Sequence, residues 1–322
     1  MSAPPNARHL LVPFAGRGSP ACRTALADLR LPKLEALLAR LTRVHDDTQD
    51  DSTRSPPHER ALAEALGIAA ADGCIPWAAL EAQRAGLGPT EDGQAWGVAT
   101  LCHWQVGIDD VMLGDPAAIE IDAEESDALL AAARPFFEED GIALHASPTP
   151  GRWLAQGPIF DGLATASIDR AVGFPISQWS PLTDAGRPLR RLQNEMQMLL
   201  YAQRVNDERT ARDQLSINSF WLSGTGVLPE HADTARIAPT VDGRLRAPAL
   251  QDDGAAWAAA WQALDAGPVA QLLAAVVRGE SVTLTLCGDR AAQRWASRPP
   301  GLQSLIKRFF ARQRPSGVLE AL

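Results

Sequence analysis

The segment Leu189–Gly226 constrains the fold more than any other part of the chain. Its first half carries apolar residues at helical spacing, which predicts a helix with one buried face. The apolar positions of that face are Leu189, Leu192, Met196, Leu199 and Leu200. A polar turn is predicted at Val205–Arg209, and the β-type run Ile217–Leu222 follows it and closes at Gly224-Thr225-Gly226. The sequence therefore predicts a helix, a polar turn and a strand in succession.

The polar residues of this segment carry a family resemblance. Asn206 and Arg209 in the turn, followed by Asn218, Trp221 and the two glycines of the strand end, resemble the archaeal-type cofactor-independent phosphoglycerate mutases. The chain is more closely similar to a smaller bacterial group described as phosphoglycerate mutase-like or RpfE-type regulatory proteins. This resemblance implies an alkaline-phosphatase-like α/β core, reduced in length here, with an inserted α+β substrate domain.

The two ends of the chain agree with an α/β core. The runs His9–Ala15 and Val282–Gly288 are apolar without alternation, as expected of neighbouring parallel strands in one sheet. Helical patterns flank both runs, which is typical of an α/β layer. We therefore expect a core made of residues 1–93 and 227–322, and an inserted α+β lobe at 94–226.

Shorter patterns fill in the remaining elements. Asp122 is expected to cap a helix that reaches about Phe137, with Glu125 completing a capping box. A short strand is expected at Ile119–Ile121, and the polar stretch His45–Pro57 is expected to be a loop. Further helices are predicted at 21–29, 33–42, 58–66 with a stop at Gly67, 77–85, 255–263, 268–277 and 302–312.

Charge and composition exclude several classes of function. The net charge is -9 and the chain has no Lys/Arg-rich run, so we expect no binding to nucleic acid or to an anionic membrane surface. The sequence has neither an apolar run of membrane-spanning length nor a signal peptide. Its four cysteines are scattered, without a pair at metal-site spacing. A cytoplasmic location follows as the expectation.

The family's reaction passes through a serine ester beside two divalent metals, and the resemblance says where those groups would lie. The first strand of relatives ends in a carboxylate ligand, whereas this chain has Pro13-Phe14-Ala15-Gly16 at that point. His58-Glu59 stands where relatives carry the nucleophile segment, with Ser55 slightly upstream, and His231 is the only histidine after Gly226. We therefore predict no metal site, no cofactor and no mutase reaction.

Other readings of the candidate catalytic residues stay open at this stage. His58 is a candidate phospho-acceptor or general base beside Glu59, although a polar pair at a helix start also suits the helix dipole. Asp109-Asp110 is either a metal pair or an acidic turn. The loop Gly16-Arg17-Gly18-Ser19 has backbone N–H groups that are suited to an anion.

Six residues are candidates for ligand binding. They are His103, Gln105, Arg152, Asn206, Arg209 and Asn218. In the family, arginines of the inserted domain hold the phosphate and carboxylate of the substrate, a task that suits guanidinium groups. His103 and Gln105 share one face of their strand. The alternative for Asn206 and Asn218 is that they satisfy backbone groups. An Arg209→Ala change is expected to leave the unliganded melting temperature nearly unchanged.

Taken with the resemblance, these residues predict a catalytically degenerate phosphoglycerate mutase relative. Its expected role is regulatory, through binding of a small phosphorylated metabolite or a protein partner. The alternative is an active, divergent phosphoglycerate mutase or a phosphatase, with a rearranged site that uses His58, His103 and acidic neighbours.

Overall fold

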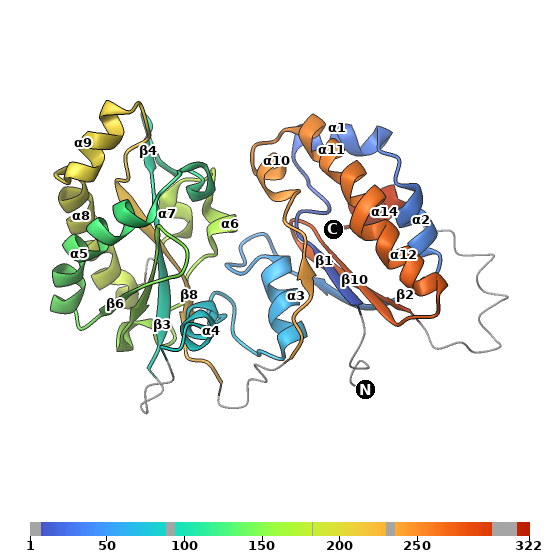
Figure 1. Cartoon of the computed structure of the whole chain (residues 1–322), viewed down its shortest axis with the longest axis horizontal. Coiled ribbons are helices and arrows are strands. Elements are labelled where there is room, and N and C mark those ends of the chain that lie inside the picture. The colour runs from blue at the N-terminus through green and yellow to red at the C-terminus, as the bar shows by residue number, and fades with distance from the viewer. Residues whose placement is uncertain (1–7, 88–93, 182, 230–235, 298–313) are drawn as a thin grey trace. The chain divides into compact units, whose positions relative to one another are not determined.

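The chain divides into two compact units. The computed structural model describes residues 8–87, 94–181, 183–229, 236–297 and 314–322. The first unit comprises Met1–Ser52, Pro56–Gly67 and Ala235–Leu322, and the second comprises Thr53–Ser55 and Ile68–Thr234 (Figure 1). The second unit thus begins before residue 94, because helix α4 (Trp77–Arg84) packs on strands β3 and β8 of its sheet.

The first unit is built on a five-stranded mixed sheet with the strand order β2-β11-β10-β1-β9. Its strands are β1 (Arg8–Val12), β2 (Leu41–Thr48), β9 (Thr240–Val241), β10 (Val282–Cys287) and β11 (Ala291–Ser297). Strand β1 pairs in parallel with β10, so the prediction that the two terminal strands share one sheet is confirmed. Strand β9 adds to the other side of β1 in parallel, while β11 and β2 run antiparallel.

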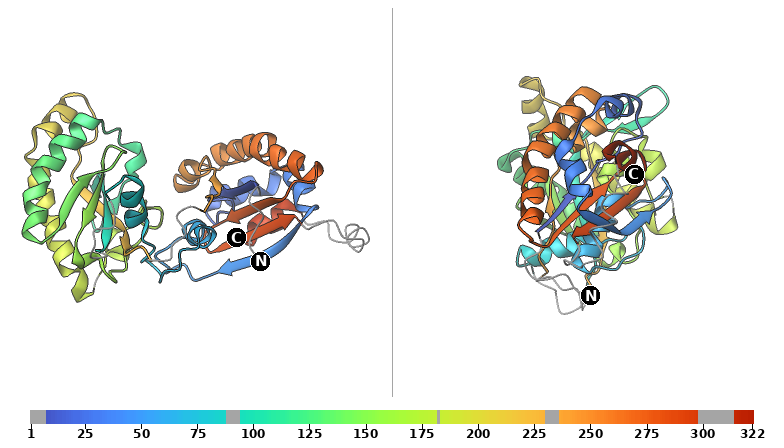
Figure 2. Two further views of the ribbon diagram at one scale, coloured as in Figure 1. Left: turned by 60° about the horizontal axis from the view of Figure 1, so that its bottom comes forward. Right: turned by 90° about the vertical axis from the view of Figure 1, so that its right-hand side faces the viewer.

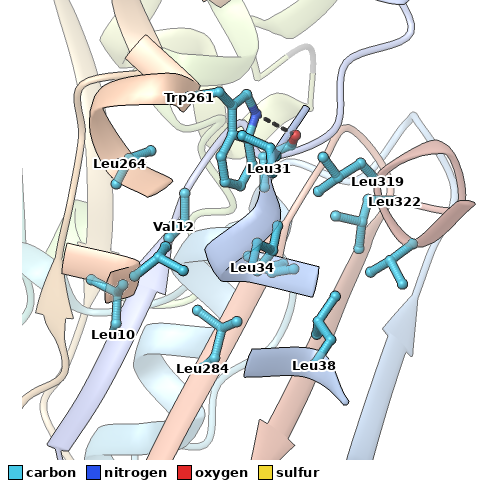
Figure 3. Close-up of a cluster of buried hydrophobic side chains, with 14 of the residues drawn as sticks. Leu10, Val12, Leu31, Leu34, Leu38, Trp261, Leu264, Leu284, Leu319 and Leu322 are labelled. Atoms are coloured by element: carbon cyan, nitrogen blue, oxygen red, sulfur yellow. Dashed lines mark hydrogen bonds between the residues drawn. The ribbon is translucent and has the colours of Figure 1, made fainter. Parts of the chain in front are cut away.

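Helices cover both faces of this sheet (Figure 2). One face carries α1 (Pro20–Asp28), α2 (Pro32–Leu38), α10 (Arg246–Leu250), α11 (Gly254–Leu264) and α12 (Ala270–Val277). Leu10, Val12 and Leu284 of the strands pack there against Leu34 and Trp261 (Figure 3). Helix α3 (Pro57–Leu66) covers the opposite face, where its Ala61 and Leu62 contact Leu11 and Cys287. It ends as predicted at Gly67, which has a φ of 74°.

The second unit has a four-stranded antiparallel sheet with the order β6-β7-β3-β8. The strands are β3 (Trp96–Cys102), β6 (Ala143–Ala146), β7 (Arg152–Gln156) and β8 (Ser219–Gly226). Strands β4 (Trp104–Val106) and β5 (Val111–Leu113) form a separate hairpin. Side chains alternate along β3, so Ala99 and Leu101 join one core while Trp96 and Val98 join another with α4.

Three helices cover the face that carries Ala99 and Leu101. They are α5 (Ala123–Glu139), α8 (Arg187–Tyr201) and α9 (Arg204–Ala211). Helix α5 begins with the predicted capping box, in which the Asp122 carboxylate accepts the Glu125 N–H at 2.8 Å. Four of the five apolar positions predicted on α8 are buried, and Leu199 is partly buried against the same cluster. Two short helices, α6 (Ile168–Ala171) and α7 (Ile176–Trp179), precede α8.

Four local predictions are wrong, and the reasons are tertiary. The polar stretch after His45 continues strand β2, because β11 supplies a partner that the sequence pattern did not reveal. For the same reason α2 ends at Leu38, and Leu41 begins the strand. Residues 119–121 form no strand and link a 3₁₀ turn to α5. The predicted polar turn at 205–209 is helix α9. The predicted helix at 302–312 lies outside the described residues.

The partly buried histidine of β1 is expected to make the first unit sensitive to acid. His9 Nε2 lies 2.8 Å from the Thr285 hydroxyl. Burial, together with the positive charge of Arg294, lowers the pKa of His9 from 6.5 to about 4. Between these pH values the unfolded chain binds a proton that the folded chain does not bind, so stability is lost as the pH falls.

We predict that the free energy of unfolding of this unit falls by up to about 3 kcal/mol between pH 6.5 and 4. His9→Gln should remove this part of the pH dependence, because glutamine does not titrate. The measurement is a denaturant titration at several pH values, followed by amide exchange in β1 and β10. An unchanged slope in the variant would show that other groups carry the acid sensitivity.

Candidate functional site

Most of the predicted ligand-binding residues secure one connection, the segment Gln214–Asn218 that leads from α9 into β8. Arg209 Nε donates to the Leu215 carbonyl at 2.7 Å, and His103 Nδ1 donates to the Ser216 carbonyl at 2.8 Å. Asn206 brackets the next residue, accepting the Ile217 N–H and donating to the Ile217 carbonyl, both at 2.7 Å. Leu215, Ser216 and Ile217 therefore each have a backbone group bound by a side chain of the second unit.

The side chain of Asn218 binds both backbone groups of Trp104, as a neighbouring strand would do. Its side-chain oxygen accepts the Trp104 N–H at 2.7 Å, and its side-chain nitrogen donates to the Trp104 carbonyl at 2.9 Å. Its own N–H donates to the Cys102 carbonyl at 3.2 Å. The side-chain amides of Asn206 and Asn218 thus satisfy backbone groups, as the alternative to ligand binding predicted.

Arg209 is held in a buried ion pair and not in a ligand-facing position. Its side chain is 2% exposed, and Nη1 lies 2.7 Å from the Glu125 carboxylate and 2.9 Å from the Glu120 carbonyl. Glu125, which is 9% exposed, also accepts from Arg212 at 2.9 Å. The carboxylate that closes the capping box of α5 is therefore neutralised by two guanidinium groups of the α9 region, and the pair joins α5 to α9.

The other two predicted residues lie elsewhere in the second unit. Arg152 on β7 pairs with Glu81 of α4 at 2.8 Å, and Ser147 donates to the same carboxylate at 2.6 Å. Gln105 is exposed on the β4–β5 hairpin. A shallow apolar depression lies between α5 and α8, and none of the six predicted residues lines it.

The loop that follows β1 in the first unit has a different character. Phe14 has a φ of 56°, which is unusual for a residue with a bulky side chain. Two tryptophans of α11 hold this backbone in place. Trp257 Nε1 donates to the Phe14 carbonyl at 3.0 Å. Trp261, labelled in Figure 3, donates from Nε1 to the Ala15 carbonyl at 3.1 Å. Strained backbone that is held from several sides marks functional sites in many proteins.

Both weak catalytic candidates lie on the first turn of α3. The His58 ring packs against the Phe14 ring, with 5.2 Å between centroids, and Glu59 is partly exposed. Two residues after His58, Arg60 pairs with Asp47 of β2 at 2.6 Å. His58 therefore lies beside the strained loop, as a packing partner of its aromatic residue.

The same loop binds a carboxylate of the protein itself. Arg17 Nη1 donates to Asp289 Oδ1 at 2.6 Å, and the Gly18 N–H donates to Asp289 Oδ2 at 2.7 Å. Asp289 lies in the turn between β10 and β11, and its side chain is 30% exposed. We call Arg17, Gly18 and the Asp289 that they bind the anion loop. The sequence indicated anion-binding donors at residues 16–19, but not that a carboxylate from the other end of the chain would occupy them.

The acidic pair suggested as metal ligands, Asp109-Asp110, gains no third ligand among the described residues. Asp109 and Asp110 form the exposed turn of the β4–β5 hairpin, where the Asp110 carbonyl accepts the Gly107 N–H at 2.8 Å. Among the described residues, no three His, Cys, Asp or Glu side chains are grouped so that they could hold a metal ion. Over the same residues, no helix is both long and apolar enough to cross a membrane.

Comparisons with known proteins give distant structural neighbours. No protein-family model matches the sequence, and no curated protein sequence matches it either. A cofactor-independent phosphoglycerate mutase from Thermoplasma acidophilum is 13% identical with a TM-score of 0.37, over 97% of this chain and 98% of that chain. The PH0037 protein from Pyrococcus horikoshii is 12% identical with a TM-score of 0.44, over 90% and 87%. At these scores no residue role is transferred from either protein.

The buried position of Arg209 reverses the expectation for its removal. We predict that Arg209→Ala lowers the stability of the second unit by about 3 kcal/mol or more, since it leaves the Glu125 carboxylate buried beside a single, half-exposed arginine. Arg204→Ala is the matched control, because Arg204 is 87% exposed in its pair with Glu208 and such pairs contribute about 1 kcal/mol or less. Thermal unfolding of both variants checks this, and equal melting temperatures would contradict it.

Proposed function

We propose that this protein is a phosphoglycerate mutase-like binding protein, on a reduced alkaline-phosphatase-like core, that does not carry out the mutase reaction. In this proposal it acts in a regulatory role of the RpfE type, in the cytoplasm, by binding a small phosphorylated metabolite. The anion loop is the binding element. The observation that carries the proposal is the pair of donors, Arg17 Nη1 and the Gly18 N–H, that already hold a carboxylate.

The geometry of these donors suits an anionic ligand. A guanidinium group and a backbone N–H that each donate to one oxygen of a carboxylate present the same pattern to a phosphate. The loop also precedes α1, whose N-terminus favours negative charge. In open α/β sheets, ligands bind beyond the carboxyl ends of the parallel strands, and Arg17 and Asp289 follow the carboxyl ends of β1 and β10.

Residue types at the same strand ends argue against phosphoryl transfer. That reaction needs carboxylate or imidazole ligands and a nucleophile around the transferred group. Strand β1 instead leads into Phe14 and Gly16, and the Phe14 ring packs on His58. Ser55, the serine nearest to the expected nucleophile position, is 3% exposed and accepts the Gly73 N–H at 2.9 Å. Its hydroxyl thus serves the backbone of the second unit.

The binding proposal is tested by removing the internal carboxylate. In Asp289→Asn, Arg17 loses its charged partner, so inorganic phosphate and 3-phosphoglycerate should stabilise the variant at concentrations about tenfold lower than wild type. Arg17→Gln should lose most of the response, because a charge-assisted contact is worth about 1.5–3 kcal/mol. The measurement is thermal shift against ligand concentration.

The matched control is Asp242→Asn. Asp242 holds Arg244 through two contacts of 2.8 Å on the loop after β9, so the change removes a similar pair away from the anion loop. Its phosphate response should equal that of wild type. A phosphate response that persists at full strength in Arg17→Gln would place the anion elsewhere and contradict the proposal.

The catalytic half of the proposal has a separate test. Purified protein should not interconvert 2- and 3-phosphoglycerate above background, with or without added manganese or zinc. The reason is that the described residues contain no group of three His, Cys, Asp or Glu side chains that could hold the metals. The assay follows either product by coupled enzymes. Metal-dependent turnover in the ordinary enzymatic range of about 1–1000 per second would favour the alternative of an active, divergent mutase or phosphatase.

A further inference from the structure

The last described segment of the chain, Arg314–Leu322, lies over the carboxyl ends of β1 and β10. Its helix α14 (Pro315–Glu320) buries Val318 and Leu319, and Leu322 is buried just beyond it. All three side chains join the apolar cluster of the first unit, and Figure 3 shows Leu319 and Leu322 directed toward the other leucines of that cluster. The segment thus fills the edge where an α/β sheet offers room for ligands.

Two glycines make the space for this segment. A Cβ on Gly16 would lie 2.2 Å from the Leu319 carbonyl oxygen, and a Cβ on Gly288 would lie 2.5 Å from Leu322 Cβ. Neither glycine has a positive φ, so these positions provide space and not a special backbone conformation. The Leu322 carbonyl then accepts N–H groups from Arg290 at 3.1 Å and from Ala291 at 2.9 Å. The docking surface is therefore fitted to the segment by shape and by hydrogen bonds.

The segment is too small to hold its structure alone. A six-residue helix is far shorter than the length at which isolated helices persist in water. Its buried surface consists of three apolar side chains, and elements with so few buried contacts open at low free-energy cost relative to the core. Loss of docking and loss of helix structure are thus expected to occur together, as one local step.

Residues of the docking surface are direct sequence neighbours of residues of the anion loop. Gly16, which contacts the segment, stands directly before Arg17 and Gly18 of the anion loop. Gly288, which also contacts the segment, stands directly before Asp289. Displacement of the Asp289 carboxylate by an external anion would remove its hydrogen bonds to Arg17 and Gly18, next to the Arg290 and Ala291 N–H groups. Those two groups are the ones that hold the Leu322 carbonyl. Anion binding and segment docking therefore act on the same short turn.

We propose that residues 314–322 form a displaceable plug over the carboxyl edge of the first unit's sheet, and that anion binding at Arg17 and Gly18 promotes its release. The plug stands on the docking geometry alone, whereas the coupling rests on the proposed function. Because coupling between two sites is reciprocal, removing the plug must strengthen anion binding by the same factor by which the anion weakens docking.

The first test uses the full chain with Leu319→Ser and Leu322→Ser together, which removes two buried apolar anchors from the plug itself. Amides of β10 should keep wild-type exchange rates, while the Arg290 and Ala291 amides should exchange at least about tenfold faster. A capped peptide of residues 314–322 added in trans should bind this variant and restore their protection. The same peptide with both leucines replaced by serine should not.

A second variant approaches the contact from the other side. Gly16→Ala places a methyl group against the Leu319 carbonyl and should raise the same exchange rates with the plug sequence intact. Gly243→Ala is its control, because a Cβ there meets nothing within 4 Å. Loss of protection throughout the unit in the leucine variant, or failure of the peptide to bind it, would overturn the plug, since the segment would then be an inseparable part of the core.

The coupling is read from phosphate titrations of the leucine variant. We expect inorganic phosphate to bind about tenfold more tightly than to wild type, and the added peptide to reverse the gain. Equal affinity in both proteins would overturn the coupling while peptide binding still upheld the plug. If neither wild type nor Asp289→Asn responds to phosphate, the proposed function fails and the coupling fails with it. The peptide result distinguishes these cases.

Discussion

The parallel pairing of β1 with β10 is the contact on which the first unit depends. It joins Arg8–Val12 to Val282–Leu286, strands from opposite ends of the sequence. Parallel strands need a long crossover, and here the whole second unit lies within that crossover. The pairing also aligns the two carboxyl ends, so that Gly16 and Arg17 from one end of the chain meet Gly288 and Asp289 from the other. No local stretch of sequence contains the anion loop, because it exists only once this pair has formed.

In the second unit, polar side chains satisfy backbone N–H and C=O groups that strand pairing satisfies elsewhere. The connection Gln214–Asn218 has irregular backbone next to a buried core, and its peptide groups need partners. Asn206, Arg209 and Asn218 supply those partners, and Glu125 balances the buried charge of Arg209. The asparagines and the arginine around this helix–strand junction are thus explained by the backbone groups of the junction that they bind. The family resemblance carried by these residues concerns how this segment folds, and leaves its chemistry open.

Sequence patterns predicted the features that depend on neighbours along the chain. The buried face of α8, the capping box of α5 and the stop at Gly67 each follow from residues within about one or two turns of a helix. The apolar runs of the terminal strands also predicted their shared sheet, because strands buried on both faces lack alternation.

Sequence patterns did not predict features that depend on partners distant in the sequence. Strand β2 is acidic and exposed along most of its length, and only its pairing with β11 makes it a strand. The burial of Arg209 follows from the position of Glu125, 84 residues away. Likewise, Gly16 and Gly288 read as ordinary loop glycines until Leu319 and Leu322 are seen to occupy the space beside them. The sequence offered the donors of the anion loop but not the carboxylate that fills them.

The Asp289 carboxylate occupies the donors that an external anion would need. This chain has a net charge of -9, and acidic side chains accept N–H groups both before α1 and in its first turn. Asp289 accepts the Gly18 N–H, and Asp252 accepts the Ala21 N–H at 3.2 Å. Under the proposed function, an external anion competes with this tethered carboxylate for Arg17 and Gly18. Asp289 is held by the β10–β11 turn, and the Leu322 carbonyl helps to hold that turn. The proposal therefore makes the strength of anion binding depend on apolar packing at the strand ends as well as on the charge of Arg17.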